Sequence, residues 1–320
     1  MSDPYKSIYD NKPATSMTTR PIKVGVIYPQ TELQGDPEAV RRIGLAAESL
    51  GFDHLVAYDH VLGASHDREI KLNGPYTEHH PFHDPFVMFA YLAGITRRIE
   101  FVTGILILPQ RQTALVARQA ADLDLLCGER FRMGVGIGWN PVEYDALGQD
   151  FSTRGKRVNE QIELLRRLWA EPLMSFDGQF DRVDRAALIP RPKRSIPIWL
   201  GGFADVALRR AARLGDGFIF ADGAADAFAQ VERLKELLQE AGRPLEEFGL
   251  QCHMLRAKTP EAVVDTVQRW HEQGGTHASV VTMGQGFTTI QQHLDYLEEV
   301  AAALRQTGLL PESPRSHQQS

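Results

Sequence analysis

The sequence has only two cysteines among its 320 residues, Cys127 and Cys252. Two cysteines cannot build a disulfide framework, and these two do not form a paired metal-binding motif. Each lies in a segment that contains apolar residues, such as Leu125 and Leu126 or Leu250 and Met254, which is typical of a buried thiol. We therefore expect both to be buried and free.

The sequence also lacks long hydrophobic runs and any excess of basic residues. No stretch approaches the ~20 apolar residues of a membrane-spanning helix, and the first twenty residues are polar, unlike a signal peptide. Lys and Arg total 35 against 41 Asp and Glu, a net charge of -6. This balance argues against binding to nucleic acid or to an anionic membrane. We expect a cytoplasmic protein.

The composition, 43% hydrophobic and 24% charged, is typical of a globular protein with a large core. Apolar runs and apolar residues at helical spacing alternate along the chain. Asp36, Asp84 and Thr259 each precede a proline and predict helix starts. The predicted strands are 23–28, 53–58, 99–108, 131–137, 197–200, 217–220, 249–255 and 278–283. The predicted helices are 36–50, 84–97, 113–126, 158–169, 204–214, 224–241, one from 259, and 288–304.

Eight strand–helix pairs favour an α/β fold of the (β/α)8 TIM-barrel type over a doubly wound sheet. Residues 171–195 are predicted to be an insertion between strands 4 and 5, with a hairpin at 175–183. We expect residues 21–305 to form the barrel. The two ends, 1–20 and 306–320, are expected to be flexible tails.

Polar groups and glycines follow several predicted strands, where a barrel carries its binding sites. Asp59-His60 offers a carboxylate beside an imidazole and could handle a proton; the alternative is a surface loop histidine. Gly201-Gly202 precedes a helix and could hold a phosphate; the alternative is a tight turn without a ligand.

The fourth predicted strand, 131–137, carries glycines and ends in a polar turn. Short side chains let a ligand approach the backbone closely. The glycines of the segment GVGIG lie within the predicted strand rather than in a turn, so we do not interpret this segment as a dinucleotide-binding motif. Trp139 could stack on a planar ligand or simply lie at the rim. The other tryptophans are predicted to be core residues: Trp169, Trp199 and Trp270.

A histidine-rich loop, 61–83, offers a competing interpretation. His79, His80, His83 and Asp84 could bind a metal and make the protein a metal-dependent barrel hydrolase. However, Asp84 is already explained as a helix cap. His79 and His80 are adjacent and face different ways in an extended chain. We therefore predict no metal site.

The chain resembles the bacterial luciferase-like monooxygenase superfamily over most of residues 22–305. The segments that carry the resemblance are DHLVAYDH, TGILILPQRQTALVARQAADLDLLCGERFRMGVGIGWNPVEYDALG and IWLGGFADVALRRAARLGDGF. Members are (β/α)8 barrels that use FMN or the deazaflavin coenzyme F420. The Asp-His pair and the run 276–286 are most similar to the F420-dependent branch.

The resemblance implies roles for particular residues. His60 and Asp59 would be catalytic, near the ring of the cofactor. Gly104-Ile105 would form the non-prolyl cis-peptide bulge that backs the ring. The remaining cofactor-binding residues would lie at the ring edge or at the phosphate: Gly136, Gly138, Trp139, Asn140 and Glu143, and Gly201, Gly202 and Phe203. The family also implies a homodimer.

Two departures from the family pattern concern the substrate. Trp139 stands where sugar-phosphate dehydrogenases of the F420 branch have a glutamate, which argues against a sugar phosphate. It also leaves the partner of His60 open, since Glu143 lies further along the chain. The loop 61–83 has no counterpart that we can align and is expected to shape the substrate pocket.

The resulting hypothesis is an oxidoreductase that transfers hydride between F420 and a small organic substrate. A rival is an FMN-dependent monooxygenase that receives reduced flavin from a partner reductase. The other rivals are the metal-dependent hydrolase and a flavin-binding member without catalytic activity.

Overall fold

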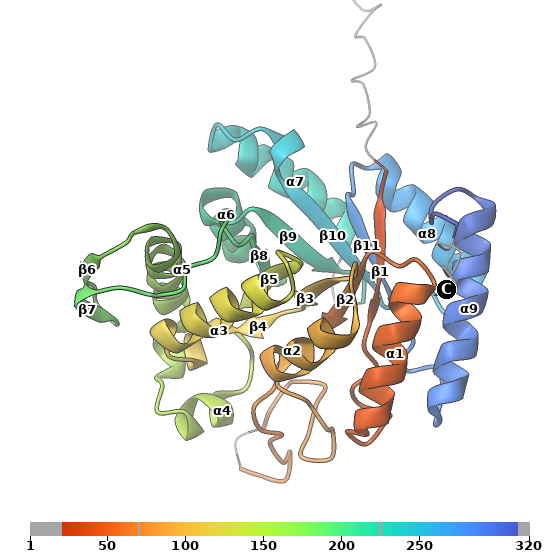
Figure 1. Cartoon of the computed structure of the whole chain (residues 1–320), viewed down its shortest axis with the longest axis horizontal. Helices are drawn as coiled ribbons and strands as arrows, with labels where there is room; N and C mark the ends of the chain where they lie inside the picture. The colour runs from red at the N-terminus through yellow and green to blue at the C-terminus, as the bar shows by residue number, and fades with distance from the viewer. Residues whose placement is uncertain (1–20, 70, 224–225, 313–320) are drawn as a thin grey trace, which may run out of the picture.

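The computed structural model describes residues 21–69, 71–223 and 226–312, and it forms a closed parallel barrel surrounded by helices (Figure 1). The predicted (β/α)8 TIM barrel is therefore confirmed, with eight strands of which the third is interrupted. The predicted tail 1–20 and the last residues of the tail 306–320 lie outside the described residues. In the described part of the chain, no helix is long and apolar enough to cross a membrane.

The barrel strands follow one another around the sheet, and β3 closes it by pairing with β5. β3 and β4 both pair with β5, so they are two pieces of one predicted strand. The barrel strands are β1 (Lys23–Ile27), β2 (His54–Ala57), β3 (Glu100–Thr103), β4 (Leu106–Ile107), β5 (Phe131–Gly136), β8 (Ile198–Gly201), β9 (Gly217–Ala221), β10 (Gly249–Met254) and β11 (His277–Val281).

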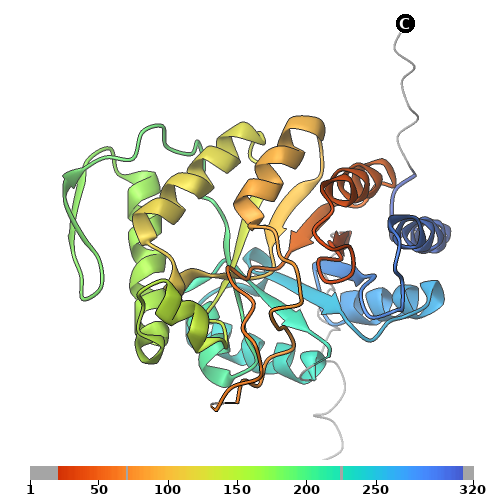
Figure 2. The ribbon, with the colours of Figure 1, turned by 90° about the horizontal axis from the view of Figure 1, so that it is seen from below.

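Helices cover the outside of the barrel (Figures 1 and 2). Three of them begin at the predicted caps, because Asp36, Asp84 and Thr259 each accept a hydrogen bond from a first-turn amide. The helices are α1 (Pro37–Ser49), α2 (Pro85–Ile95), α3 (Thr113–Leu126), α4 (Pro141–Ala146), α5 (Arg154–Ala170), α6 (Asp205–Leu214), α7 (Ala227–Glu240), α8 (Pro260–Glu272) and α9 (Ile290–Gln306). Short 3-10 turns occur at Leu108–Gln110, Phe151–Thr153 and Leu245–Glu247.

The predicted insertion between strands 4 and 5 contains an antiparallel hairpin, β6 (Met174–Asp177) and β7 (Arg182–Ala186). It projects from the side of the barrel (Figure 1). Glu160 of α5 fixes its turn, because its carboxylate accepts hydrogen bonds from the amides of Gln179, Phe180 and Asp181. The hairpin turn is therefore tied to α5, on the outside of the barrel.

Apolar side chains fill both sides of the sheet. The larger cluster lies between the strands and the helices, and the smaller one fills the barrel interior with residues such as Val102, Ile219 and Val281. Trp169, Trp199 and Trp270 are buried, as predicted. Cys127 and Cys252 are both buried and free, as predicted.

Candidate active site

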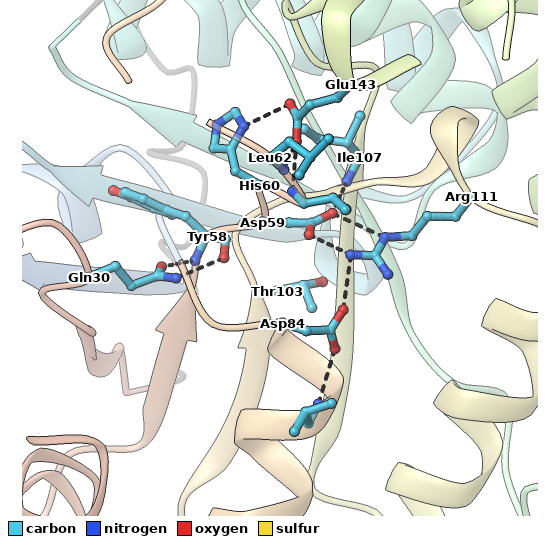
Figure 3. A network of polar contacts seen from close by, with 12 residues as sticks. Gln30, Tyr58, Asp59, His60, Leu62, Asp84, Thr103, Ile107, Arg111 and Glu143 are labelled. Carbon is cyan, nitrogen blue, oxygen red and sulfur yellow. Dashed lines mark hydrogen bonds and ion pairs between the residues drawn. The ribbon is translucent and has the colours of Figure 1, made fainter. Parts of the chain in front are cut away.

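The carboxyl ends of the strands carry the loop 61–83, which crosses the barrel near its centre when viewed from below (Figure 2). The loop starts directly after Tyr58, Asp59 and His60, the three residues that follow β2. Successive side chains of an extended chain alternate in direction. In Figure 3, His60 is turned towards Glu143, whereas Asp59 is turned towards Arg111.

His60 and Glu143 form a buried hydrogen-bonded pair. Nδ1 of His60 lies 2.9 Å from Oε2 of Glu143, and the Glu143 side chain is fully buried. The amides of Val61 and Leu62 donate to the other carboxylate oxygen, Oε1, at 2.7 and 3.2 Å. With the carboxylate as an acceptor, Nδ1 carries a proton and Nε2 is left as the free ring nitrogen. Glu143 therefore reaches His60, the point left open by the sequence.

Aromatic rings surround the imidazole of His60. Its ring centroid lies 5.3 Å from that of Tyr76, 4.9 Å from that of Phe82 and 5.7 Å from that of Trp139. Tyr76 and Phe82 belong to the loop 61–83, so this loop covers His60. Burial raises the pKa of Tyr76 to about 12, which keeps its phenol neutral near pH 7.

Gly74 brings the loop against the turn that follows β5. A Cβ atom at Gly74 would lie 2.2 Å from the ring carbons Cε2 and Cζ2 of Trp139. Only a residue without a side chain fits there. Trp139 is half-buried, between the loop and His60.

Asp59 belongs to a different network. Its Oδ2 accepts from the amide of Ile107 at 2.9 Å, and its Oδ1 accepts from Nη2 of Arg111 at 2.6 Å. The same Nη2 atom donates to Asp84 at 3.1 Å. Figure 3 shows this chain of ion pairs next to the His60–Glu143 pair. The sequence placed Asp59 beside His60, but it gave no indication of Arg111.

The interruption of the third strand lies at Gly104–Ile105, where the peptide bond is cis, as the resemblance implies. The side chain of Ile105 occupies the space left by two glycines. A Cβ at Gly136 would lie 2.6 Å from Cδ1 of Ile105, and one at Gly201 would lie 2.7 Å from its Cγ2. The structure thus brings the bulge, Gly136 and Gly201 together. Gly138 packs in the same way against Ile107.

Gly201, Gly202 and Phe203 lead into α6. The cap residue of this helix is Ala204, whose side chain cannot accept a hydrogen bond, and among the described residues no side chain caps the first amides. Gly202 has φ of +153°, and a Cβ there would lie 2.8 Å from that of Ala207. Phe203 is 60% exposed. This end of α6 offers backbone donors that could bind an anionic group.

Asn140 has a structural explanation in addition to its predicted role. Its side chain accepts from the amide of Val142 and caps α4, the short helix that carries Glu143. The sequence did not predict α4. Asn140 followed by Pro141 was the signal that could have indicated it.

The described residues of the histidine-rich loop do not come together as a metal site. Residues 21–69, 71–223 and 226–312 contain no group of three or more His, Cys, Asp or Glu side chains that could hold an ion. The side chain of His79 is 83% exposed, and Nδ1 of His80 accepts from the amide of Thr77. Asp84 caps α2 and pairs with Arg111.

Several proteins of known sequence or structure resemble this chain. An uncharacterized protein of Mycobacterium tuberculosis is 34% identical over 267 residues, which cover 80% of this chain and 91% of the relative. An F420-dependent glucose-6-phosphate dehydrogenase of Nakamurella multipartita is 29% identical over 74% of this chain and 68% of its own. The structure of an F420-dependent secondary alcohol dehydrogenase, in complex with an F420-acetone adduct, superposes with a TM-score of 0.72 at 17% identity, over 89% of this chain and 99% of that one.

The family model described as luciferase-like monooxygenase matches residues 19–313, a range that includes all the described residues. The closed barrel agrees with this match. The chain therefore belongs to the luciferase-like monooxygenase family, a family of oxidoreductases.

Proposed function

We propose that the protein is an F420-dependent oxidoreductase in which His60, held by Glu143, transfers a proton to or from an organic substrate. The observation that carries this proposal is the buried contact between Nδ1 of His60 and Glu143. Because Nδ1 is bound to Glu143, Nε2 is the ring nitrogen that can exchange a proton with a substrate. The bound deazaflavin would supply the hydride acceptor or donor.

The proton chemistry follows from the substrate's own bonds. Oxidation of an alcohol to a carbonyl removes a hydride from carbon and a proton from oxygen. In this direction Nε2 of His60 accepts the proton, and in the reverse direction it returns the proton to the carbonyl oxygen. Glu143 holds the ring in one orientation and stabilises the positive charge that the imidazole gains.

The residues at the barrel mouth fit a cofactor with a ring and a phosphate. We propose that Gly104 and Ile105 support the ring, and that Gly136, Gly138, Trp139 and Asn140 lie along its edge. The amides of Gly201, Gly202 and Phe203, at the uncapped start of α6, would hold the phosphate. The names of the F420-dependent relatives support the deazaflavin.

The FMN-dependent monooxygenase is the second candidate, because the family model and a relative are both named as monooxygenases. Such an enzyme would receive reduced flavin from a partner reductase. In this case His60 would act as a proton donor. We place the F420 proposal first because of the Asp59-His60 pair and the run 276–286.

Equilibrium titration distinguishes the two cofactors. F420 and FMN, each oxidised and reduced, are titrated into the protein and followed by fluorescence. We expect tighter binding of F420. Tighter binding of FMN, or FMN that copurifies with the protein, would overturn the choice of cofactor. Reactivity of the reduced complex with dioxygen is the second readout, since reduced deazaflavins react very slowly.

Replacement of His60 tests the catalytic role. His60→Ala should lower the rate of single-turnover hydride transfer by roughly 10²–10⁴-fold. Affinity for the cofactor should change much less, because the proposed ring and phosphate contacts lie elsewhere. An unchanged rate would remove His60 from the mechanism. So would a loss of cofactor binding large enough to account for the whole defect.

We also propose a homodimer that forms through the outward face of α2. Val87, Tyr91 and Ile95 recur at every fourth position and are 69%, 48% and 37% exposed. The whole helix carries no charged residue. An exposed helix face normally carries polar residues, and an apolar one indicates a contact surface. A cytoplasmic location stays a prediction.

A further inference from the structure

We propose that Arg111 is a positioning residue, which fixes the end of β2 relative to the bulge at Gly104–Ile105 and thereby holds His60 in place. The proposal rests on the proposed function, because it takes His60 to be the residue that acts on the substrate. The argument starts from the contacts of Asp59, the residue that precedes His60 in the chain.

Asp59 connects two parts of the barrel mouth. Its side chain is 1% exposed, and the amide of Ile107 donates to it at 2.9 Å. Ile107 lies two residues after the bulge. Arg111 approaches the same carboxylate with two nitrogens, Nη2 at 2.6 Å and Nε at 3.3 Å. The end of β2 and the chain that follows the bulge are thus fastened to one carboxylate.

Arg111 extends this connection to two helices. Nη2 also donates to Asp84, whose other oxygen caps α2 through the amide of Val87. The backbone carbonyl of Arg111 accepts from Gln161 of α5 at 3.0 Å. The guanidinium is therefore held between two carboxylates (Figure 3). Gln161 fixes the backbone of the same residue.

Each of the three residues after β2 is held by a different element. The side chain of Gln30, which follows β1, accepts from the amide of Tyr58 at 2.6 Å and donates to its carbonyl at 3.1 Å. Arg111 and the amide of Ile107 hold Asp59. Glu143 of α4 holds His60. The segment 58–60 therefore has little freedom to move, which suits a group that must meet a substrate at a fixed distance.

A lysine cannot make the same contacts. Arg111 uses the fixed fork of its guanidinium to reach Asp59 with two nitrogens and Asp84 with one of them, whereas an ammonium is a single point of charge. Burial alone would lower the pKa of Arg111, but Asp59 and Asp84 raise it above its ordinary value, so the side chain stays charged. Without this fork, the buried carboxylate of Asp59 loses the two-nitrogen contact that holds it.

The alternative is that the ion pair contributes to stability alone, and the chain offers a matched control. Arg194 pairs with Asp124, a fully buried carboxylate, at 2.7 Å, and the same nitrogen donates to the carbonyl of Phe131. Phe131 is the first residue of β5. The Arg194–Asp124 pair therefore lies at the opposite end of the barrel from His60 and resembles the Arg111–Asp59 pair in its chemistry.

The experiment compares Arg111→Lys with Arg194→Lys in the full-length protein without added cofactor. The readout is the proton NMR signal of the His60 Nδ1–H group, assigned by its loss in His60→Gln, and its exchange rate with water. Thermal unfolding is measured in parallel. We expect both variants to lose stability. Only Arg111→Lys should shift this signal and raise its exchange rate by about tenfold or more. In this variant the segment 58–60 is held less firmly, so the opening of the hydrogen bond between His60 and Glu143 costs less free energy.

Enzymatic assay provides the second readout. In single-turnover measurements with the bound cofactor, Arg111→Lys should lower the rate by up to about 10²-fold, since small displacements of a reacting group have effects of this size. The substrate concentration at half-maximal rate should change much less. Arg194→Lys should retain the wild-type rate.

Two results would overturn the proposal. One is an Arg111→Lys protein whose His60 signal and rate match those of Arg194→Lys. The other is a rate that falls only in proportion to the fraction of unfolded protein.

If Arg111→Lys does not fold, Asp84→Asn replaces it. Asparagine keeps the cap of α2 and removes the negative charge that Arg111 contacts besides Asp59. The same NMR readout then decides. Failure of both cofactors to bind the wild type would refute the proposed function, whereas the NMR comparison would still test the position of His60.

Discussion

The imidazole of His60 and the carboxylate of Glu143 lie within hydrogen-bond distance, 2.9 Å, although 83 positions separate them in the sequence. His60 follows β2, and Glu143 lies in α4, just after β5. The barrel joins these two segments because β3 pairs with both β2 and β5. The contact is what turns a histidine at a strand end into an oriented imidazole with one free nitrogen.

The first prediction concerns Glu143. Glu143→Gln should lower single-turnover hydride transfer by at least about 10²-fold, because a neutral amide cannot stabilise the charge that His60 gains. The amide keeps an oxygen for the Val61 and Leu62 amides, so the fold and cofactor affinity should persist. Titration and stopped-flow measurements check both. Glu171→Gln, at an exposed pair with Arg167, is the control with an unchanged rate. A wild-type rate in Glu143→Gln would contradict the assignment.

The second prediction concerns the outward face of α2. If this face joins two copies, Tyr91→Lys should convert a dimer into a monomer of 35.8 kDa, because it places an unpaired charge in an apolar contact. Sedimentation equilibrium measures the mass. Leu173→Lys is the control, because Leu173 is 61% exposed and lies beside the hairpin rather than on α2. A wild-type monomer, or a Tyr91→Lys dimer, would refute this interface.

Much of the fold could be predicted from the sequence, because its signals are local. Buried parallel strands require continuous apolar runs, and each barrel strand from β1 to β11 lies within a predicted run or overlaps it. The Asp-Pro and Thr-Pro caps indicated the starts of α1, α2 and α8. The predicted third strand was continuous, whereas the structure divides it at Gly104–Ile105.

The candidate site was only partly predictable, because it depends on contacts between distant residues. The sequence indicated that Asp59 and His60 end a strand, but not which of them faces the mouth. It also left open whether Glu143 reaches His60. Arg111 gave no signal, since an arginine in a turn is ordinary until the structure places Asp59 and Asp84 around it.

The third prediction concerns stability at low pH. Burial, together with the positive charge of Arg132, lowers the pKa of His253 to about 3. The unfolded chain, with an ordinary histidine pKa near ~6.5, then binds more protons than the folded protein between these values. Stability due to this group is therefore complete above pH ~6.5 and declines as the pH falls, by about 2 kcal/mol at pH 5.

Urea unfolding at pH 7 and pH 5 measures this dependence. His253→Gln cannot titrate, so the difference between its free energies of unfolding at the two pH values should be smaller by about 2 kcal/mol. The comparison uses each protein as its own reference, which removes any constant loss of stability in the variant. An unchanged difference would show that His253 does not contribute.

The last prediction concerns the contact between Gly74 and Trp139, which closes the loop 61–83 over His60. In Gly74→Ala the new Cβ atom would lie 2.2 Å from the indole carbons, so the loop and the indole must separate. Trp169, Trp199 and Trp270 are at most 5% exposed, and Trp139 is the half-buried tryptophan of the four. Quenching of tryptophan fluorescence by acrylamide therefore reports mainly on Trp139. We expect stronger quenching and a red-shifted emission in Gly74→Ala.

Gly155→Ala is the control, because a Cβ there meets its nearest atom at 3.5 Å, an ordinary contact. Equal quenching in Gly74→Ala and the wild type would mean that the loop does not depend on this contact to cover His60.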